Sequence, residues 1–191
     1  MKLITCVLCF SCLYCNSVFS QVKYEKEYRI KKNEIPKNIK SYLDEITFKN
    51  KIKWYKDEGL SKYTYEAKTS HNNLNFSIEF DSLGIIEDVE IEIRWNDIPE
   101  LVKKSIEFYL DGKYQKKKII KVQVQYTGEP EYLIDIINDE ESKKRLTRKY
   151  EIVLKGKENK KFQMMEYLFS NEGKFERKAI IMMKNIDNLE F

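Results

Sequence analysis

Hydrophobic residues alternate with polar ones along much of the chain. Phe76, Ile78 and Phe80 are each separated by one polar residue, and the same period of two runs through residues 117–127. Such alternation is typical of an antiparallel sheet with helices on one face and water on the other. It predicts strands over residues 50–57, 61–69, 74–81, 85–95, 117–127, 131–138, 148–155, 162–170 and 174–184.

Two segments follow a helical period instead, and each begins at an Ile-Pro pair. The pairs are Ile35-Pro36 and Ile98-Pro99, and apolar residues follow both at helical spacing. Proline in the first turn costs no helical hydrogen bond, because the N–H it lacks has no partner there. We therefore predict two helices, each with one apolar face.

Two similar turns indicate that this plan occurs twice. Residues 80–84 and 169–173 each begin with an aromatic residue and end with a glycine suited to a tight hairpin. The predicted fold is α+β with two tandem repeats, each a helix packed on a roughly four-stranded antiparallel sheet. The first repeat covers residues 21–96, and the second covers 97–191 with an insertion placed at 139–148.

The first twenty residues have the pattern of a signal peptide. A positive start precedes an apolar stretch over residues 3–14, and Val18 and Ser20 suit a cleavage before Gln21. We predict export to the periplasm or the medium after cleavage near Ser20-Gln21. A retained anchor or a buried N-terminal helix is the alternative, and a lipoprotein anchor at Cys12 or Cys15 is a further minor one.

All four cysteines lie in that segment. They are Cys6, Cys9, Cys12 and Cys15, so cleavage would leave 171 residues without cysteine. The mature chain would then have no disulfide, no thiolate nucleophile and no cysteine metal site.

These landmarks also carry a family resemblance. The Ile-Pro helices, the Trp54-Tyr55 strand, the 80–84 turn and the Glu-rich strand ending at Trp95 resemble the PepSY-like proteins, which are also described as β-lactamase-inhibitor-like. The resemblance covers roughly residues 25–184. It implies a small secreted or periplasmic protein of a gram-negative bacterium built from tandem helix-plus-sheet repeats. It transfers no inhibitory residue, because no matching contact loop is defined.

Candidate catalytic chemistry is sparse. His71 is the only histidine and lies in a predicted hairpin loop, where an exposed turn residue is the simplest interpretation. There is no phosphate-binding glycine loop, dinucleotide fingerprint or calcium loop. We predict no enzymatic activity, no catalytic residue, no cofactor and no metal site. The acidic run over residues 87–92 leaves weak binding of a divalent cation as an alternative.

Charge argues against nucleic acid. Lysines and arginines cluster at residues 113–118 and 143–149, but 35 basic residues face 31 acidic ones and the net charge is only +4. Solvated sheet edges that discourage strand pairing explain these clusters better. The apolar run at the N-terminus is too short for a membrane span, and no later run reaches that length.

Aromatic residues of the first half offer the only candidate partner-binding surface. On the open face of the sheet they would form a rigid contact surface, whereas the alternative, which we favour, is packing beneath the helix over residues 35–46. The set consists of Trp54, Tyr55, Tyr63, Tyr65 and Trp95.

The sequence thus favours a non-enzymatic binding protein. It would bind a protein or peptide of the cell envelope through a sheet face or edge and would restrain a secreted enzyme by occlusion. This interpretation predicts a solid core and an exposed aromatic patch. The alternative is an envelope module that binds a small molecule or lipid between the repeats, which predicts a sizeable apolar cavity.

Overall fold

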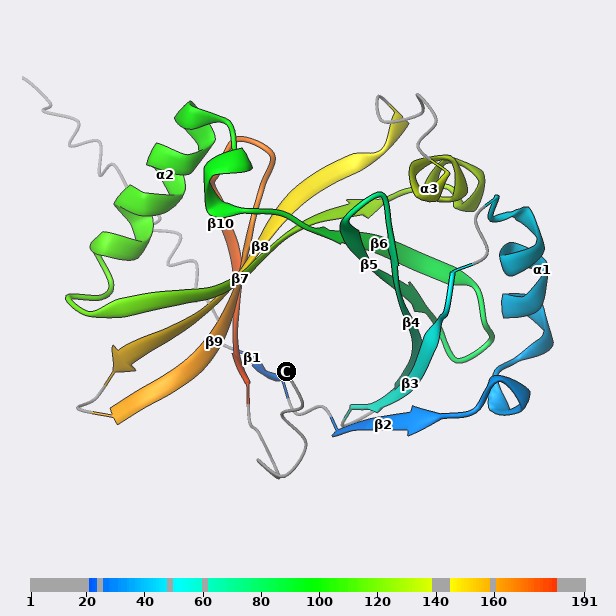
Figure 1. Ribbon diagram of the computed structural model, residues 1–191. Coiled ribbons are helices and arrows are strands. Elements are labelled where there is room, and N and C mark those ends of the chain that lie inside the picture. The colour runs from blue at the N-terminus through cyan, green and yellow to red at the C-terminus, as the bar shows by residue number, and fades with distance from the viewer. Residues whose placement is uncertain are drawn as a thin grey trace, which may run out of the picture.

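One sheet of ten strands runs through the computed structural model (Figure 1). The structure describes residues 21–23, 26–47, 50–59, 62–138, 145–158 and 161–181. The strand order is β1-β10-β9-β8-β7-β6-β5-β4-β3-β2, and all neighbours are antiparallel except β1 and β10. The strands are β1 (Gln21–Lys23), β2 (Lys26–Ile30), β3 (Lys53–Glu58), β4 (Tyr63–His71), β5 (Leu74–Phe80), β6 (Ile86–Glu92), β7 (Lys117–Thr127), β8 (Thr147–Glu158), β9 (Lys161–Phe169) and β10 (Phe175–Ile181).

The prediction of two tandem helix-on-sheet repeats is wrong. Strand β6 pairs with β7, with Glu90 opposite Gln125 and Ile91 opposite Val124, so both halves of the chain contribute to a single sheet. Two separate sheets would each have exposed another row of unpaired backbone groups at this point. Joining them satisfies those groups and produces one continuous core.

The three α-helices of the described residues lie on the outer, convex side of the curved sheet (Figure 1). Helices α1 (Lys37–Glu45) and α2 (Glu100–Asp111) begin directly after Pro36 and Pro99, as predicted. Short 3-10 turns precede them at η1 (Lys32–Glu34) and η2 (Trp95–Asp97). The buried Ile39 of α1 and the buried Ile106 and Leu110 of α2 belong to one hydrophobic core with the convex face of the sheet.

The third helix replaces a predicted strand. Residues 130–137 form α3 (Pro130–Ile137), with Pro130 in its first turn and Leu133, Ile134, Ile136 and Ile137 buried. A short apolar run suits either a buried strand or a buried helix, so periodicity alone does not distinguish them. The proline favours the helix, because it fits a first turn and cannot donate to a central ladder.

Two turns that contain glycine pack against helices α1 and α2. Gly84 and Gly173 have φ values of 81° and 76°, in the region that favours glycine. A Cβ atom on Gly84 would lie 3.0 Å from Cγ1 of Ile39, and one on Gly173 would lie 2.7 Å from the carbonyl oxygen of Val102. Each turn therefore packs directly against the first turns of a helix.

The sheet curls until its two edges approach each other at one corner. The edge strands β1 and β2 are consecutive in the chain, and Lys23 and Lys26 are three residues apart. Their Cα atoms can be separated by at most about 11 Å. The concave face consequently lines a trough. The predicted signal peptide and most of the predicted insertion lie outside the described residues.

Candidate functional site

Buried polar side chains line the concave face of the sheet. Period-two alternation sends apolar residues to the helices and polar ones to this side, and the curvature then crowds the polar ones together. The side of the face formed by β8–β10 is more apolar and includes Val153, Leu168 and Ala179. The buried polar residues include Glu66, Ser77, Asp88, Glu90, Gln123, Glu151 and Glu166.

An acidic hollow of about 380 Å³ occupies one end of the trough. Burial raises the pKa of Glu90, and the nearby carboxylates of Glu151, Glu79 and Asp88 raise it further, against an opposing effect of Lys121. Glu90 therefore holds a proton more tightly than an exposed glutamate. The charged residues that line the hollow are Asp57, Glu79, Glu87, Asp88, Glu90, Glu151, Lys62 and Arg177.

Two groups of carboxylates in this face could reach a common cation. Oxygens of Glu79, Asp88 and Glu90 lie within 4.8 Å of one another, as do those of Glu27, Asp57 and Glu66. In the second group, the ammonium group of Lys68 already pairs with two of the carboxylates. Lys68 Nζ lies 2.6 Å from Glu27 Oε1 and 2.9 Å from Glu66 Oε2.

Lys68 is accordingly held in its charged form. Burial opposes the charge, but Glu66 and Glu27 outweigh it and raise the pKa of the ammonium group. Ser77 Oγ donates a hydrogen bond to Glu66, and the Lys68 ammonium lies 4.6 Å from the centre of the Tyr55 ring. The Lys68 ammonium thus offsets one of the three carboxylate charges of this group.

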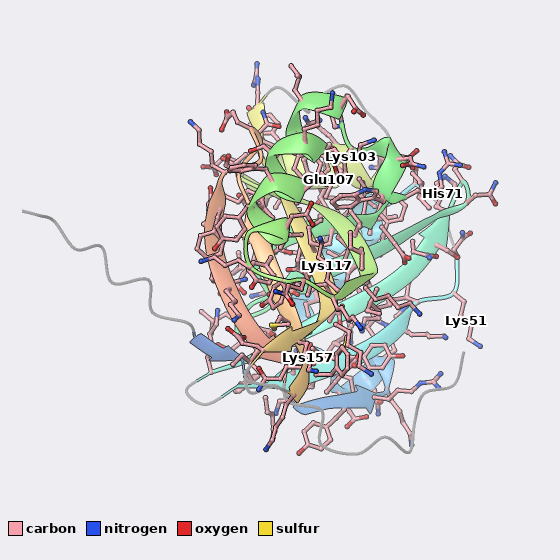
Figure 2. All side chains as sticks on the ribbon, turned by 90° about the vertical axis from the view of Figure 1, so that its left-hand side faces the viewer. Lys51, His71, Lys103, Glu107, Lys117 and Lys157 are labelled. Carbon is pink, nitrogen blue, oxygen red and sulfur yellow. The ribbon has the colours of Figure 1, made fainter. Side chains whose placement is uncertain are left out.

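A lysine-lined hollow of about 560 Å³ occupies the other end of the trough. Among the described residues, four lysines and one carboxylate, that of Glu92, line it. Figure 2 shows Lys51 and His71 at the same edge of the molecule, which is the end where β4 turns into β5. The lining lysines are Lys51, Lys53, Lys68 and Lys121.

Two glutamines of β7 donate to carboxylates of the acidic hollow, and one of them, Gln123, also lines the lysine hollow. Gln123 Nε2 donates to Glu90 Oε2 at 2.8 Å, and Gln125 Nε2 donates to Asp88 Oδ2 at 3.2 Å. The sequence pattern placed these glutamines on the polar face. It gave no sign that they would be buried, because their burial depends on curvature that brings distant strands together.

The five predicted aromatic residues do not gather on one surface. Trp54 is 4% exposed and packs in the core, 6.4 Å from the Phe80 ring centre. Tyr65 and Trp95 are partly buried against the same core. Tyr55 lies on the concave face beside Lys68, and Tyr63 is 39% exposed.

Contacts between these aromatic residues are few. Tyr63 and Tyr65 form an edge-to-face pair with ring centres 5.8 Å apart. Trp95 Nε1 donates instead to Glu107 Oε1 of α2 at 3.3 Å. Figure 2 shows Glu107 on α2 near Lys103, on the outer side of the molecule. Of the five, Tyr55 is the one that lies on the same face as the hollows.

His71 is the last residue of β4 and is partly buried rather than fully exposed. The hairpin predicted around it is present, with Asn72 and Asn73 at φ values of 50° and 63°. No helix among the described residues has the length and apolar character needed to cross a membrane.

Known structures share this fold. A DUF2874 family protein from Bacteroides ovatus superposes with a TM-score of 0.53 at 12% identity, over 77% of this chain and 89% of that one. A candidate periplasmic protein from Bacteroides eggerthii gives 0.53 at 14% identity, over 76% and 88%. A BLIP-like protein from Bacteroides fragilis gives 0.50 at 14% identity, over 80% and 91%.

These likenesses establish the fold. They confirm the β-lactamase-inhibitor-like part of the predicted resemblance, while its PepSY part stays a prediction. No protein-family model matches the sequence, and no curated protein matches it.

Proposed function

We propose that this chain is an exported, non-enzymatic binding protein that uses the concave face of its sheet to hold a protein or peptide of the cell envelope. The observation that carries the proposal is the trough itself. It presents two charged hollows on one face of the sheet, and helices α1, α2 and α3 cover the opposite face. A partner segment in the trough would be covered without any covalent step.

The lining of the trough favours a polar partner over a lipid. Charged and polar side chains dominate both hollows, whereas a lipid site is predominantly apolar. The fold shared with a BLIP-like protein supports the same interpretation, since that name denotes likeness to an inhibitor. Occlusion of a secreted enzyme is the form of binding that we infer from it.

Export is the second element of the proposal. It rests on the signal-like first twenty residues, with cleavage near Ser20-Gln21, and on the fold shared with a candidate periplasmic protein. Among the predicted aromatic residues, Tyr55 is the one that lies on the concave face, where it could contact a partner.

Site-specific photo-crosslinking tests which face binds. A photoreactive phenylalanine replaces Tyr55 on the concave face, and in a matched control it replaces Phe108, which is 85% exposed on α2. Each variant is expressed in cells, irradiated and analysed by mass spectrometry of the purified protein. We expect a protein adduct from position 55 and none from position 108.

Three results would contradict the proposal. These are equal adducts from both positions, adducts only from α2, or no protein adduct from a position-55 variant whose circular dichroism matches that of the unmodified protein. A lipid or small-molecule adduct at position 55 would instead support the alternative of an envelope small-molecule module. If the captured protein is an enzyme, stoichiometric addition of this chain should lower its activity.

A further inference from the structure

The charge of the trough reverses along the strand direction. The lysine hollow is formed by the end of β4, the start of β5 and the middle of β7, through residues 68–70, 75–77, 121 and 123. The acidic hollow is formed by the opposite ends of the same strands, through residues 62–64, 79 and 125–127. The two hollows are therefore the two halves of one trough that runs parallel to the strands.

The lysine hollow carries positive charge that the described residues do not neutralise. Lys68 is paired with Glu66 and Glu27, but Lys51, Lys53 and Lys121 form no ion pair in the part of the chain that the structure describes. The carboxylate of Glu92 accepts a hydrogen bond from Asn75 Nδ2 at 3.2 Å. These three ammonium groups outnumber the single carboxylate among the described lining residues, and Lys121 also acts on Glu90 of the acidic hollow, so net positive charge remains for an anionic ligand.

A buried acceptor lies in the same hollow. Gln123 is 5% exposed and lines the hollow, and its Oε1 atom accepts no hydrogen bond among the described residues. Its amide nitrogen already donates to Glu90. A buried carbonyl without a donor is costly, so an N–H group from a ligand would be favoured at this point. The hollow therefore favours a ligand that offers both negative charge and a hydrogen-bond donor.

We propose that the trough binds an extended polypeptide segment that places an acidic side chain in the lysine hollow, a backbone N–H on Gln123 Oε1 and a basic side chain in the acidic hollow. The inference rests on the proposed function and specifies its partner. A polypeptide supplies carboxylate and N–H together, whereas lipid chains supply neither. A volume of about 560 Å³ accommodates an acidic side chain with its neighbours.

The register of the strands predicts the spacing of these charges. Equivalent points of the two hollows lie about four to six residues apart along β3, β4 and β7, at about 3.3 Å per residue. An extended segment has nearly the same rise as the strands beneath it. Its acidic and basic residues should therefore also be separated by about four to six positions.

Fluorescence anisotropy with synthetic peptides tests this inference. The probe is a fluorescein-labelled eight-residue peptide with two aspartates and two arginines separated by four serine or glycine residues. Two comparison peptides replace either the aspartates or the arginines by serine. We expect the bipolar peptide to bind the purified protein more tightly than either comparison peptide, with an affinity that falls as salt is added.

Paired variants test whether the lysine hollow binds the acidic residues of the peptide. The double variant Lys53→Gln/Lys121→Gln should weaken binding of the bipolar peptide about tenfold. The control, Lys37→Gln/Lys40→Gln, removes the same charge from exposed positions on α1 and should leave binding unchanged. Thermal melts of both variants must match that of the parent protein.

Four outcomes would overturn the inference. They are equal binding of all three peptides, an equal loss in the control variant, no peptide binding, or binding of free succinate as tight as that of the bipolar peptide. The last would make the hollow a small-anion site. If no peptide binds while position 55 still captures a protein, the proposed function stands and only this inference fails.

Discussion

The two faces of the sheet are both buried near the centre, but they are built in opposite ways. Ile78 and Ser77 are neighbours on β5 and are 0% and 6% exposed. Ile78 belongs to the hydrophobic core, whereas the Ser77 hydroxyl donates to Glu66. Apolar contact gains free energy without requiring direction, while buried polar groups require placed partners. The convex face therefore supplies stability, and the concave face is suited to recognition.

The largest expected contrast is between these two neighbours. Ile78→Ala should lower the free energy of unfolding by about 2–5 kcal/mol, because it removes buried methyl groups and leaves a cavity. Ser77→Ala should cost less, about 1.5–3 kcal/mol, the net value of one hydrogen bond to a charged group. Urea unfolding followed by circular dichroism measures both. Equal losses would show that the concave network contributes as much stability as the core.

The second-largest effect is expected at Gly173, where the backbone of the turn lies directly against α2. Gly173→Ala should destabilise the protein by about 2–3 kcal/mol, since the new Cβ would require a strained φ and would meet the Val102 carbonyl oxygen at 2.7 Å. Gly112→Ala is the control, because a Cβ there has only ordinary contacts at 3.5 Å. Thermal unfolding of both variants should show a large shift for the first alone, and similar shifts would contradict this role of the turn.

The concave face should show its character through pH. Because the pKa of Glu90 is raised, the folded state keeps a proton that the unfolded chain releases. Glu90 therefore lowers the stability of the fold as the pH rises above 4.5, the ordinary pKa of a glutamate. Glu90→Gln keeps an acceptor for Gln123 and should stabilise the protein by about 1 kcal/mol or more at pH 7. The gain should vanish near pH 4.

A pH series of urea midpoints for the parent and the Glu90→Gln variant measures this difference. A constant gain across the series would contradict a proton-linked origin. A loss of stability at pH 7 would show that the charged form of Glu90 is stabilised by its surroundings.

The smallest effect concerns the outer side of the helices. Phe108→Gln on α2 should change the free energy of unfolding by less than about 0.5 kcal/mol, because the side chain is 85% exposed. Leu110→Ala, two residues along the same helix and 0% exposed, should cost about 2–5 kcal/mol. Chemical denaturation of the pair locates the outer boundary of the core. A large effect at Phe108 would place that boundary further out.

Local pattern was sufficient wherever neighbouring residues decide the structure. The Ile-Pro pairs marked the starts of α1 and α2, and alternation located eight of the ten strands within a few residues. The turns at Gly84 and Gly173 followed from residues that favour a positive φ. These features depend on contacts a few positions apart, which a sequence displays directly.

The predictions from the sequence failed where the structure of a segment depends on residues far away in the chain. The apolar segment of α3 fits a strand as well as a helix by its period. Pro130 is a local sign of a helix start, but the burial of Leu133 and Ile136 depends on the rest of the fold. The apparent repeat suggested two sheets, and only the pairing of β6 with β7 joined them. Strands β1 and β2 were not predicted at all.

The sequence by itself determined which residues face each side of the sheet, the two proline-initiated helices, and the absence of cysteine after residue 15. The tertiary structure alone decided that one sheet curls upon itself, that Glu90 lies among Glu79, Asp88 and Glu151, and that four lysines gather at the other end of the same trough. The physical reason is that period-two alternation sets the side of a strand, whereas curvature and strand order set which side chains meet across it.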